Sequence, residues 1–367
     1  MAPESILRHA VDWLPFRKTI QFLPVAKAIQ LNKESKVSLR IPGRLLWTLL
    51  ALHKRIWPRL PASLRFGACG RAYGRHIHRM VQRIAIRNQS HGTFFLRNRP
   101  ELELMCRLQD QKPSGSSLRL AIVACSKGAE VYSMLWAIRS TRPDLKISTT
   151  AIDISREILE FAERGEYTLD DARYLKERSP GSVPKIIEAT WKDQPVSIFE
   201  RMTREEMEAM FEIEGSHAKI RPWLKEGVTW FAGDASDPGL VRVLGPQDIV
   251  VANRFLCHMA PEAAEKCLRN IVRLVKPGGF LFVTGVDLDI RAKVASALGW
   301  NPVPDLLKEI HEGDSSLKDG WPLNYWGLEP FRHDLPDWKM RYTAVFQIGQ
   351  APFKGQALTP MVAALQG

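Results

Sequence analysis

The chain has 367 residues, 45% of them hydrophobic, which is enough for a sizeable core and for one large domain or two. It contains no run of about 18 apolar residues, so we expect no transmembrane segment. Residues 1–14 carry charge inside their apolar stretch and lack a small-residue cleavage site, so we expect no signal peptide there. The five cysteines are scattered and form no C-x-x-C pair, which argues against a disulfide framework and against a zinc site. We therefore expect a cytoplasmic protein without a bound metal.

Basic residues are concentrated at the start of the chain. Residues 1–100 hold 19 lysines and arginines but only three acidic residues, whereas the whole chain has a net charge of +12. Arginines that recur every four residues predict a basic stripe on one side of a helix: Arg71, Arg75, Arg79, Arg83 and Arg87. Such a module attracts an acidic protein partner, an anionic membrane surface or, with less support, nucleic acid. A stripe that is only solvated explains the pattern equally well.

The pattern divides the chain into three parts. We expect residues 1–108 to form the basic α-helical module and the polar residues 109–117 to form a linker. From residue 118 onward strands alternate with helices, which predicts a mostly parallel sheet with helices on both faces. Strands are predicted at 118–124, 146–153, 227–235 and 341–349, a strand with its following turn at 247–256, and a turn with its strand at 277–287. Helices are predicted at 128–140, 155–165 with Ser155 as N-cap, and 261–275.

Residues 167–226 interrupt this alternation. They are expected to be irregular, apart from a helix at 203–213. An insertion of this kind often covers a ligand site, so we interpret it as a lid.

Several strands are followed by residues that can bind a ligand, and parallel strands bring such residues to one edge of the sheet. In "ACSKGAE" (124–130), small residues let backbone N–H groups approach a ligand at a helix N-terminus. Asp153 can accept the hydrogen bonds of two ribose hydroxyls, and Asp234 can meet an adenine amino group. Asn253 and Arg254 follow the next strand, where a substrate would meet the cofactor. Simpler explanations remain open, namely that Asp153 only starts a helix, Asp234 is a turn residue and Gly128 only turns the chain.

The turn after the first strand distinguishes between cofactors. It holds a single glycine rather than G-x-G-x-x-G, so no seat for a pyrophosphate is evident. A mononucleoside cofactor with a carboxylate tail fits the residues better, and S-adenosylmethionine meets that description.

Together these stretches resemble one family from residue 93 onward. "ACSKGAEVYSM" resembles the "CStGeEpYS" motif of the CheR-type chemoreceptor glutamate methyltransferases. "TFFLRNRP" is similar to their T-x-F-F-R segment with one residue inserted before Arg97, and "DIVVANRFLCHM" resembles "DvifCRNvliYf". The resemblance implies a Rossmann-like class I methyltransferase fold, α/β, with a mostly parallel seven-stranded sheet whose last strand is antiparallel.

The resemblance also implies roles for individual residues. Arg97 would lie near the methionine carboxylate of S-adenosylmethionine, Glu130 would hold its amino group and Asp153 its ribose hydroxyls. The remaining implied cofactor contacts are Ala124, Ser126 and Gly128 along the tail, Asp234 and Ala235 at the adenine, and Asn253 beside the reacting methyl group.

The sequence departs from the family pattern at the site. Lys127 and Ala129 replace a threonine and a glutamate, Asn253-Arg254 inverts the usual order, and His258 stands where a tyrosine usually lies. His258 is a candidate base for a hydroxyl or amine acceptor, and Arg254 can orient a carboxylate or simply pair with Asp234 or Asp287.

The C-terminal segment is expected to lack the small inserted β-subdomain of receptor-binding members. Its aromatic residues either build an acceptor pocket or, as we favour, seal the sheet edge and pack on the N-terminal module: Trp321, Tyr325, Trp326 and Trp338.

From these observations we expect a cytoplasmic S-adenosylmethionine-dependent methyltransferase that acts on a protein glutamate carboxylate. A small-molecule or lipid-linked acceptor is the alternative, and the basic module would then place the enzyme at the membrane periphery. A degenerate signalling adaptor that has lost cofactor affinity is a third hypothesis, and a nucleic-acid methyltransferase a fourth.

Overall fold

The structure is a computed structural model that describes residues 52–53, 55–85, 87, 89–169 and 197–349. Its larger sheet has the strand order β6-β2-β1-β7-β8-β10-β9. The strands are β1 (Ser117–Val123), β2 (Lys146–Asp153), β6 (Val228–Ala232), β7 (Gln247–Val251), β8 (Val275–Phe282), β9 (Asn301–Pro302) and β10 (Val345–Gln347). β10 runs antiparallel to both β8 and β9, and the other strand pairings of this sheet are parallel. The expected seven-stranded, mostly parallel sheet with an antiparallel last strand is therefore confirmed.

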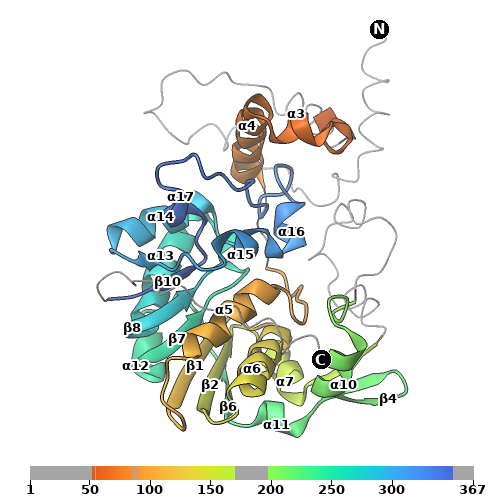
Figure 1. The fold of residues 1–367 in the computed structure, drawn as a ribbon, viewed down its shortest axis with the longest axis vertical. Coiled ribbons are helices and arrows are strands. Elements are labelled where there is room, and N and C mark those ends of the chain that lie inside the picture. The colour runs from red at the N-terminus through yellow and green to blue at the C-terminus, as the bar shows by residue number, and fades with distance from the viewer. Residues whose placement is uncertain (1–51, 54, 86, 88, 170–196, 350–367) are drawn as a thin grey trace.

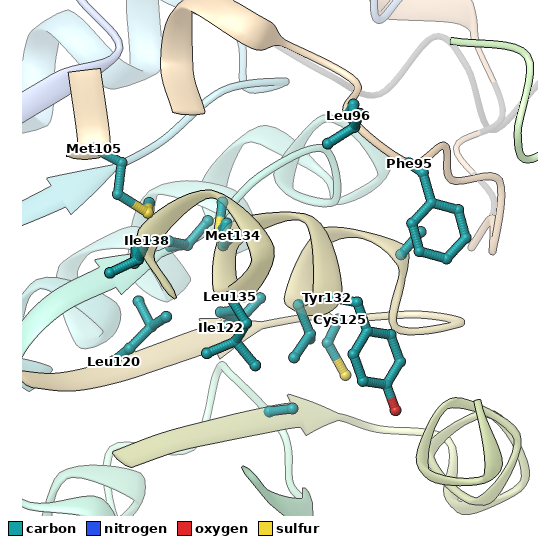
Figure 2. Packing of buried hydrophobic residues seen from close by; sticks show 14 of the residues in the cluster. Phe95, Leu96, Met105, Leu120, Ile122, Cys125, Tyr132, Met134, Leu135 and Ile138 are labelled. Carbon is teal, nitrogen blue, oxygen red and sulfur yellow. The ribbon is translucent and has the colours of Figure 1, made fainter. Parts of the chain in front are cut away.

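Helices cover both faces of this sheet (Figure 1). β1 explains why, because its side chains alternate between the faces. Leu120 and Ile122 join one hydrophobic cluster, whereas Ala121 and Val123 join the other. The first cluster lies under α5 (Arg99–Gln109), α6 (Ala129–Thr141) and α7 (Arg156–Arg164), and the second under α12 (Leu240–Leu244), α13 (Pro261–Ile271) and α14 (Leu288–Ala297). Figure 2 shows Met134, Leu135 and Ile138 of α6 packed over β1 in the first cluster.

The described part of the N-terminal region is helical and consists of η2 (Trp57–Arg59), α3 (Ala62–Phe66) and α4 (Ala68–Ile84). α4 contacts the C-terminal segment, because the Trp321 ring occupies the space beside Gly74 and lies 5.6 Å from the Trp57 ring. Residues 1–51 of the predicted helical module lie outside the described residues. None of the helices in the described ranges is long and apolar enough to cross a membrane.

α5 packs with the sheet rather than with the N-terminal helices. Leu104 and Met105 are fully buried in the same cluster as β1 and α6. The polar residues 109–117 therefore connect two elements of one packed unit.

The insertion contains a second sheet that the sequence did not reveal. β3 (Glu166–Thr168), β5 (His217–Ile220) and β4 (Phe211–Glu214) form an antiparallel sheet in the order β3-β5-β4. The helix predicted at 203–213 is shorter, because α10 (Arg204–Met210) ends where Phe211 begins to pair with Ile220. The expectation of irregular structure was wrong here. A small β-subdomain exists, earlier in the chain than the C-terminal segment in which none was found. Residues 170–196, in the middle of the expected lid, lie outside the described residues.

One further element end differs from the predictions. Arg341 and Tyr342 belong to α17 (Trp338–Tyr342) rather than to the last strand, which begins at Val345. The strand and turn predicted over 247–256 are found, because β7 ends at Val251 and a loop leads from it to η3 (Leu256–His258). Short helices complete the C-terminal region: η4 (Val272–Leu274), α15 (Leu307–Gly313) and α16 (Ser315–Lys318), while α11 (Pro222–Lys225) follows β5.

Candidate active site

A cleft opens at the carboxyl ends of β6, β2, β1 and β7, the four neighbouring strands at which the sequence placed ligand-binding residues. Its volume is about 250 Å³. Ten of the eleven predicted site residues line it: Arg97, Ala124, Ser126, Glu130, Asp153, Asp234, Ala235, Asn253, Arg254 and His258. The order of strands reverses between β1 and β7, which is where ligands bind in open α/β sheets.

Backbone strain is concentrated at this cleft. Ala124, Ser126 and Arg254 have φ angles of 56°, 51° and 66°, in the left-handed region that residues other than glycine rarely adopt. Leu96, next to Arg97, has a φ of 49°. Strained residues persist where the surrounding structure fixes them, and they cluster at functional sites.

Asp153 joins the ends of β1 and β2. Its Oδ2 accepts a hydrogen bond from the Ser126 backbone N–H at 2.9 Å, and its Oδ1 accepts one from the Ser155 N–H at 3.1 Å. The Ser155 side chain caps α7 by accepting from the Ile158 N–H, as predicted. Since each carboxylate oxygen has more than one acceptor site, Asp153 both fixes the turn and retains capacity toward the cleft.

Gly128 does not line the cleft, in contrast to the prediction. It precedes α6 as N-cap with a φ of 82°. A Cβ at this position would lie 3.0 Å from the Ala162 Cβ and 3.2 Å from the Tyr132 ring. The glycine is therefore explained by the turn and by close packing of α6 against α7.

Asp234 and Ala235 follow β6 at the far side of the cleft. Asp234 is exposed, and its Oδ1 accepts a hydrogen bond from the Ser236 N–H at 2.8 Å. It is therefore a turn residue that also faces the cleft, so its role in the turn does not exclude contact with a ligand.

Asn253 is buried and holds two carboxyl groups. Its Nδ2 donates to Glu101 Oε1 at 2.6 Å and to Glu130 Oε1 at 2.8 Å. Its Oδ1 accepts from both the backbone N–H and the hydroxyl of Thr284, each at 2.9 Å. Both donor hydrogens and both lone pairs of the amide are thus in use, which fixes its orientation.

A smaller cavity of about 20 Å³ adjoins the cleft, and several charged side chains line it. Arg97, Glu130, Asn253 and Arg254 line both spaces. Asp314, the N-cap of α16, lies 3.4 Å from Arg254 Nη1 and 3.2 Å from Arg201 Nη2. Burial opposes ionisation of Asp314, but Arg254, Arg97 and Arg201 lower its pKa to about 2. The sequence had suggested Asp234 or Asp287 as the partner of Arg254, but Arg254 pairs with Asp314 instead.

His258 contacts the C-terminal segment. Its Nδ1 lies 2.7 Å from the Tyr325 hydroxyl. Burial, followed by the charges of Arg254 and Arg87, lowers the pKa of His258 to about 4, so the imidazole is neutral at pH 7.

Arg87, the last arginine of the predicted stripe, belongs to the site rather than to a solvated face. It follows α4 and donates to the carbonyls of Cys257 and Met259, on either side of His258. It also pairs with Asp287 at 3.2 Å. The prediction of a continuous stripe was therefore wrong at Arg87, whereas Arg79 and Arg83 are exposed on α4.

Two other features of the sequence gain a structural explanation. Cys257 is buried and the pKa of its thiol is raised to about 11 by that burial, which leaves no thiolate to act as a nucleophile. Of the C-terminal aromatic residues, Trp321 packs on the N-terminal helices and Trp338 on Phe331, while Tyr325 reaches His258 at the cleft.

Comparison with known proteins identifies the kind of domain that surrounds the cleft. Residues 91–181 match the family model described as the CheR methyltransferase SAM-binding domain, and residues 206–283 match the model of a methyltransferase domain. These matches support an S-adenosylmethionine-dependent methyltransferase, and they cover residues 91–181 and 206–283 of the 367. The cofactor expected from the sequence is thereby confirmed, and the CheR resemblance is supported.

Similar proteins add little about the acceptor. The chain is 27% identical, over 184 residues, to an uncharacterized 104.1 kDa protein of Rhodobacter capsulatus, and the match covers 48% of this chain but only 16% of that relative. The citrinin polyketide synthase CMeT domain is 16% identical with a TM-score of 0.30, and the match covers 50% of this chain and 33% of the chain of that structure. Magnesium protoporphyrin IX methyltransferase from Synechocystis PCC 6803 is 12% identical with a TM-score of 0.30, at 63% and 87% coverage.

The sequence singled out neither Glu101 nor Asp314, and it named Arg87 only in the basic stripe and Tyr325 only among the C-terminal aromatic residues. Glu101 could have been recognised from the sequence, because it falls on the same face of the helix as Leu104, Met105 and Leu108. An acidic residue on an apolar helix face is unusual and indicates a specific role. The other three come from distant segments, and no local pattern links them to the cleft.

Proposed function

We propose that this methyltransferase transfers the methyl group of S-adenosylmethionine to a carboxylate, most consistently a glutamate side chain of a protein. The cofactor, when bound, supplies a methyl group on a sulfonium that is open to in-line displacement. The chain has to hold an acceptor oxygen about 3–3.5 Å from that carbon and in line with the sulfur.

The cleft residues fit this cofactor. Asp153 offers carboxylate oxygens for the ribose hydroxyls, and Asp234 an oxygen for the adenine amino group. Arg97 and Glu130 stand at the opposite end, where an amino acid tail needs one positive and one negative partner. Each of these roles is a proposal that follows the family resemblance and agrees with the placement of the residues.

Arg254 is the observation that carries the choice of acceptor. Its Nη1 is buried and forms no hydrogen bond within the described part of the chain, although Asp314 lies 3.4 Å away. A buried donor that stands in an ion pair but makes no hydrogen bond is incompletely satisfied, and a carboxylate is the group that a guanidinium binds best. An acceptor carboxylate at the cleft would supply that hydrogen bond.

The state of His258 supports the same choice. A base whose pKa is about 4 holds a proton weakly and gives little assistance to a hydroxyl or amine acceptor at pH 7. A carboxylate acceptor is already anionic and needs no base. The Tyr325–His258 pair then shapes the cleft instead of moving a proton.

The basic helices are proposed as the docking surface for an acidic protein partner. Arg79 and Arg83 are exposed on α4, and Leu64 and Phe66 are exposed on α3 beside it. A mixed basic and apolar surface suits an acidic amphipathic helix, and such binding should weaken as salt is raised.

The experiment is methyl transfer from labelled S-adenosylmethionine to glutamate-rich helical peptides. A glutamate methyl ester loses its label as methanol in mild base, whereas a methylated amine does not. We expect base-labile label, and we expect Arg254→Gln to reduce its formation by about 100-fold, the equivalent of about 3 kcal/mol of charged hydrogen bonding. Arg242→Gln on the exposed face of α12 is the matched control and should leave transfer unchanged. Base-stable label, or transfer only to small molecules, would replace the glutamate assignment.

A further inference from the structure

The carboxyl pair behind the cleft has a geometry that the reaction described above does not require. Glu101 comes from α5, Glu130 from the first turn of α6, and Asn253 from the loop after β7. One amide group donates one hydrogen to each carboxyl, so the two carboxyl groups are held beside each other in a space that water barely enters.

The surroundings restrict how much charge this pair can carry. Glu101 is 4% exposed, and the charges that act on it are those of Glu130, Asp314 and Arg97. Two ionised carboxyls held this close repel, and burial disfavours both. Accordingly, burial and the charge of Glu130 raise the pKa of Glu101 to about 8, and burial raises the pKa of Glu130 as well.

Asn98 lines the same small cavity as Glu101. The Oδ1 atom of Asn98 is buried and accepts no hydrogen bond from any residue in the described ranges. The Asn98 amide nitrogen is committed to the Ile310 carbonyl at 2.9 Å, so its oxygen stays directed as it is. A protonated carboxyl has an O–H to donate, which an ionised carboxyl lacks.

We propose that Glu101 and Glu130, bridged by Asn253, together hold one proton while no cofactor is bound. They release that proton to solvent when the ammonium group of the cofactor binds. Glu101 is then a positioning residue that couples cofactor binding to proton release. No covalent bond changes, since the proton passes to buffer and the ammonium supplies the compensating positive charge. The inference rests on the cofactor cleft proposed above and extends it to a residue with no assigned role.

The sign of the effect follows from linkage. A group whose pKa falls when a ligand binds gives up a proton, and the ligand therefore binds more tightly as pH rises toward the free pKa. With a free pKa of about 8, Glu101 is about 90% protonated at pH 7, so binding should release about 0.9 proton at that pH. Affinity should increase close to tenfold, a limit set by one released proton, between about pH 6 and pH 7.

The test is calorimetric titration of the full chain with S-adenosylhomocysteine, which carries the same ammonium group. Titrations at pH 7 in phosphate and in Tris differ by the heat of the released proton, because the two buffers have different ionisation enthalpies. The wild type should release about one proton. Glu101→Gln, which keeps the size and the acceptor oxygen that faces Asn253, should bind without release. Glu103→Gln on the same helix, at a partly exposed ion pair with Arg107, is the matched control and should behave as the wild type.

The outcomes are distinguishable. Binding by the wild type without proton release, or undiminished release in Glu101→Gln, would overturn the proposal while leaving the cofactor cleft in place. Failure of the folded wild type to bind at all would instead reject the cleft. The affinity of the wild type across pH 6 to 7 gives a second reading that depends on no variant.

Discussion

Gly128 provides a quantitative test of how the turn before α6 is built. Gly128→Ala forces a residue with a side chain to adopt a φ of 82°, which costs about 1–2 kcal/mol. The added Cβ would meet Ala162, Tyr132 and Trp230 at 3.0, 3.2 and 3.3 Å, closer than ordinary contact, and overpacking of this kind costs about 1–3 kcal/mol more. The free energy of unfolding should therefore fall by about 2–5 kcal/mol, measured by urea denaturation.

Gly215→Ala separates the two contributions. Gly215 has a φ of 60°, but no atom lies within 4 Å of the place that a Cβ would take, so only the backbone cost of about 1–2 kcal/mol applies. We therefore predict a larger loss at Gly128 than at Gly215. Equal losses at the two positions would show that packing of α6 against α7 does not determine the glycine.

Three other predictions address the cleft and the loop beside it. Asp153→Asn should weaken S-adenosylhomocysteine binding by about 30- to 100-fold through loss of charged hydrogen bonds, as measured by calorimetry. The same change at the exposed Asp234 should weaken binding less. Equal effects of the two changes would contradict the ribose assignment. Arg87→Gln should lower the free energy of unfolding by about 2–4 kcal/mol because it leaves Asp287 without its ion-pair partner, while Arg83→Gln on the exposed face should change it by less than about 0.5 kcal/mol in the same denaturation assay. His258 has a pKa of about 4 in the folded state and 6.5 in the reference state, so the unfolded chain binds more protons there and stability should fall as pH decreases from about 6.5 to 4, a dependence that His258→Asn should reduce.

The sequence was informative wherever structure depends on local pattern. The strand at 146–153 was predicted with its exact bounds, since β-branched residues are frequent in it and turn signals flank it, and the Ser155 cap followed from residue type alone. Ten of the predicted site residues line one cleft, because parallel strands bring their carboxyl ends to a common edge.

The errors occurred where distant contacts override local preference. Phe211–Ile213 continue the helical pattern of α10, yet they form a strand because His217–Ile220 offers them a partner. Gly128 had the right residue type for a ligand-binding turn, but only the positions of Ala162 and Tyr132 reveal why a side chain is excluded.

The buried charges of the site were the hardest to predict. Asp314 lies far beyond Arg254 and Asn253 in the sequence, and Glu101 lies far before them. Nothing in the composition of any one segment indicates that these groups share a cavity. Arg87 shows the same effect, because its spacing continued a helical stripe although the helix ends at Ile84.

The most direct test of the cofactor assignment is titration of the folded, full-length wild type with S-adenosylhomocysteine. We predict binding at one site per chain with a dissociation constant near the micromolar range, about −8 kcal/mol. Absence of binding up to millimolar ligand, in a protein that unfolds cooperatively, would contradict the assignment of the cleft to this cofactor.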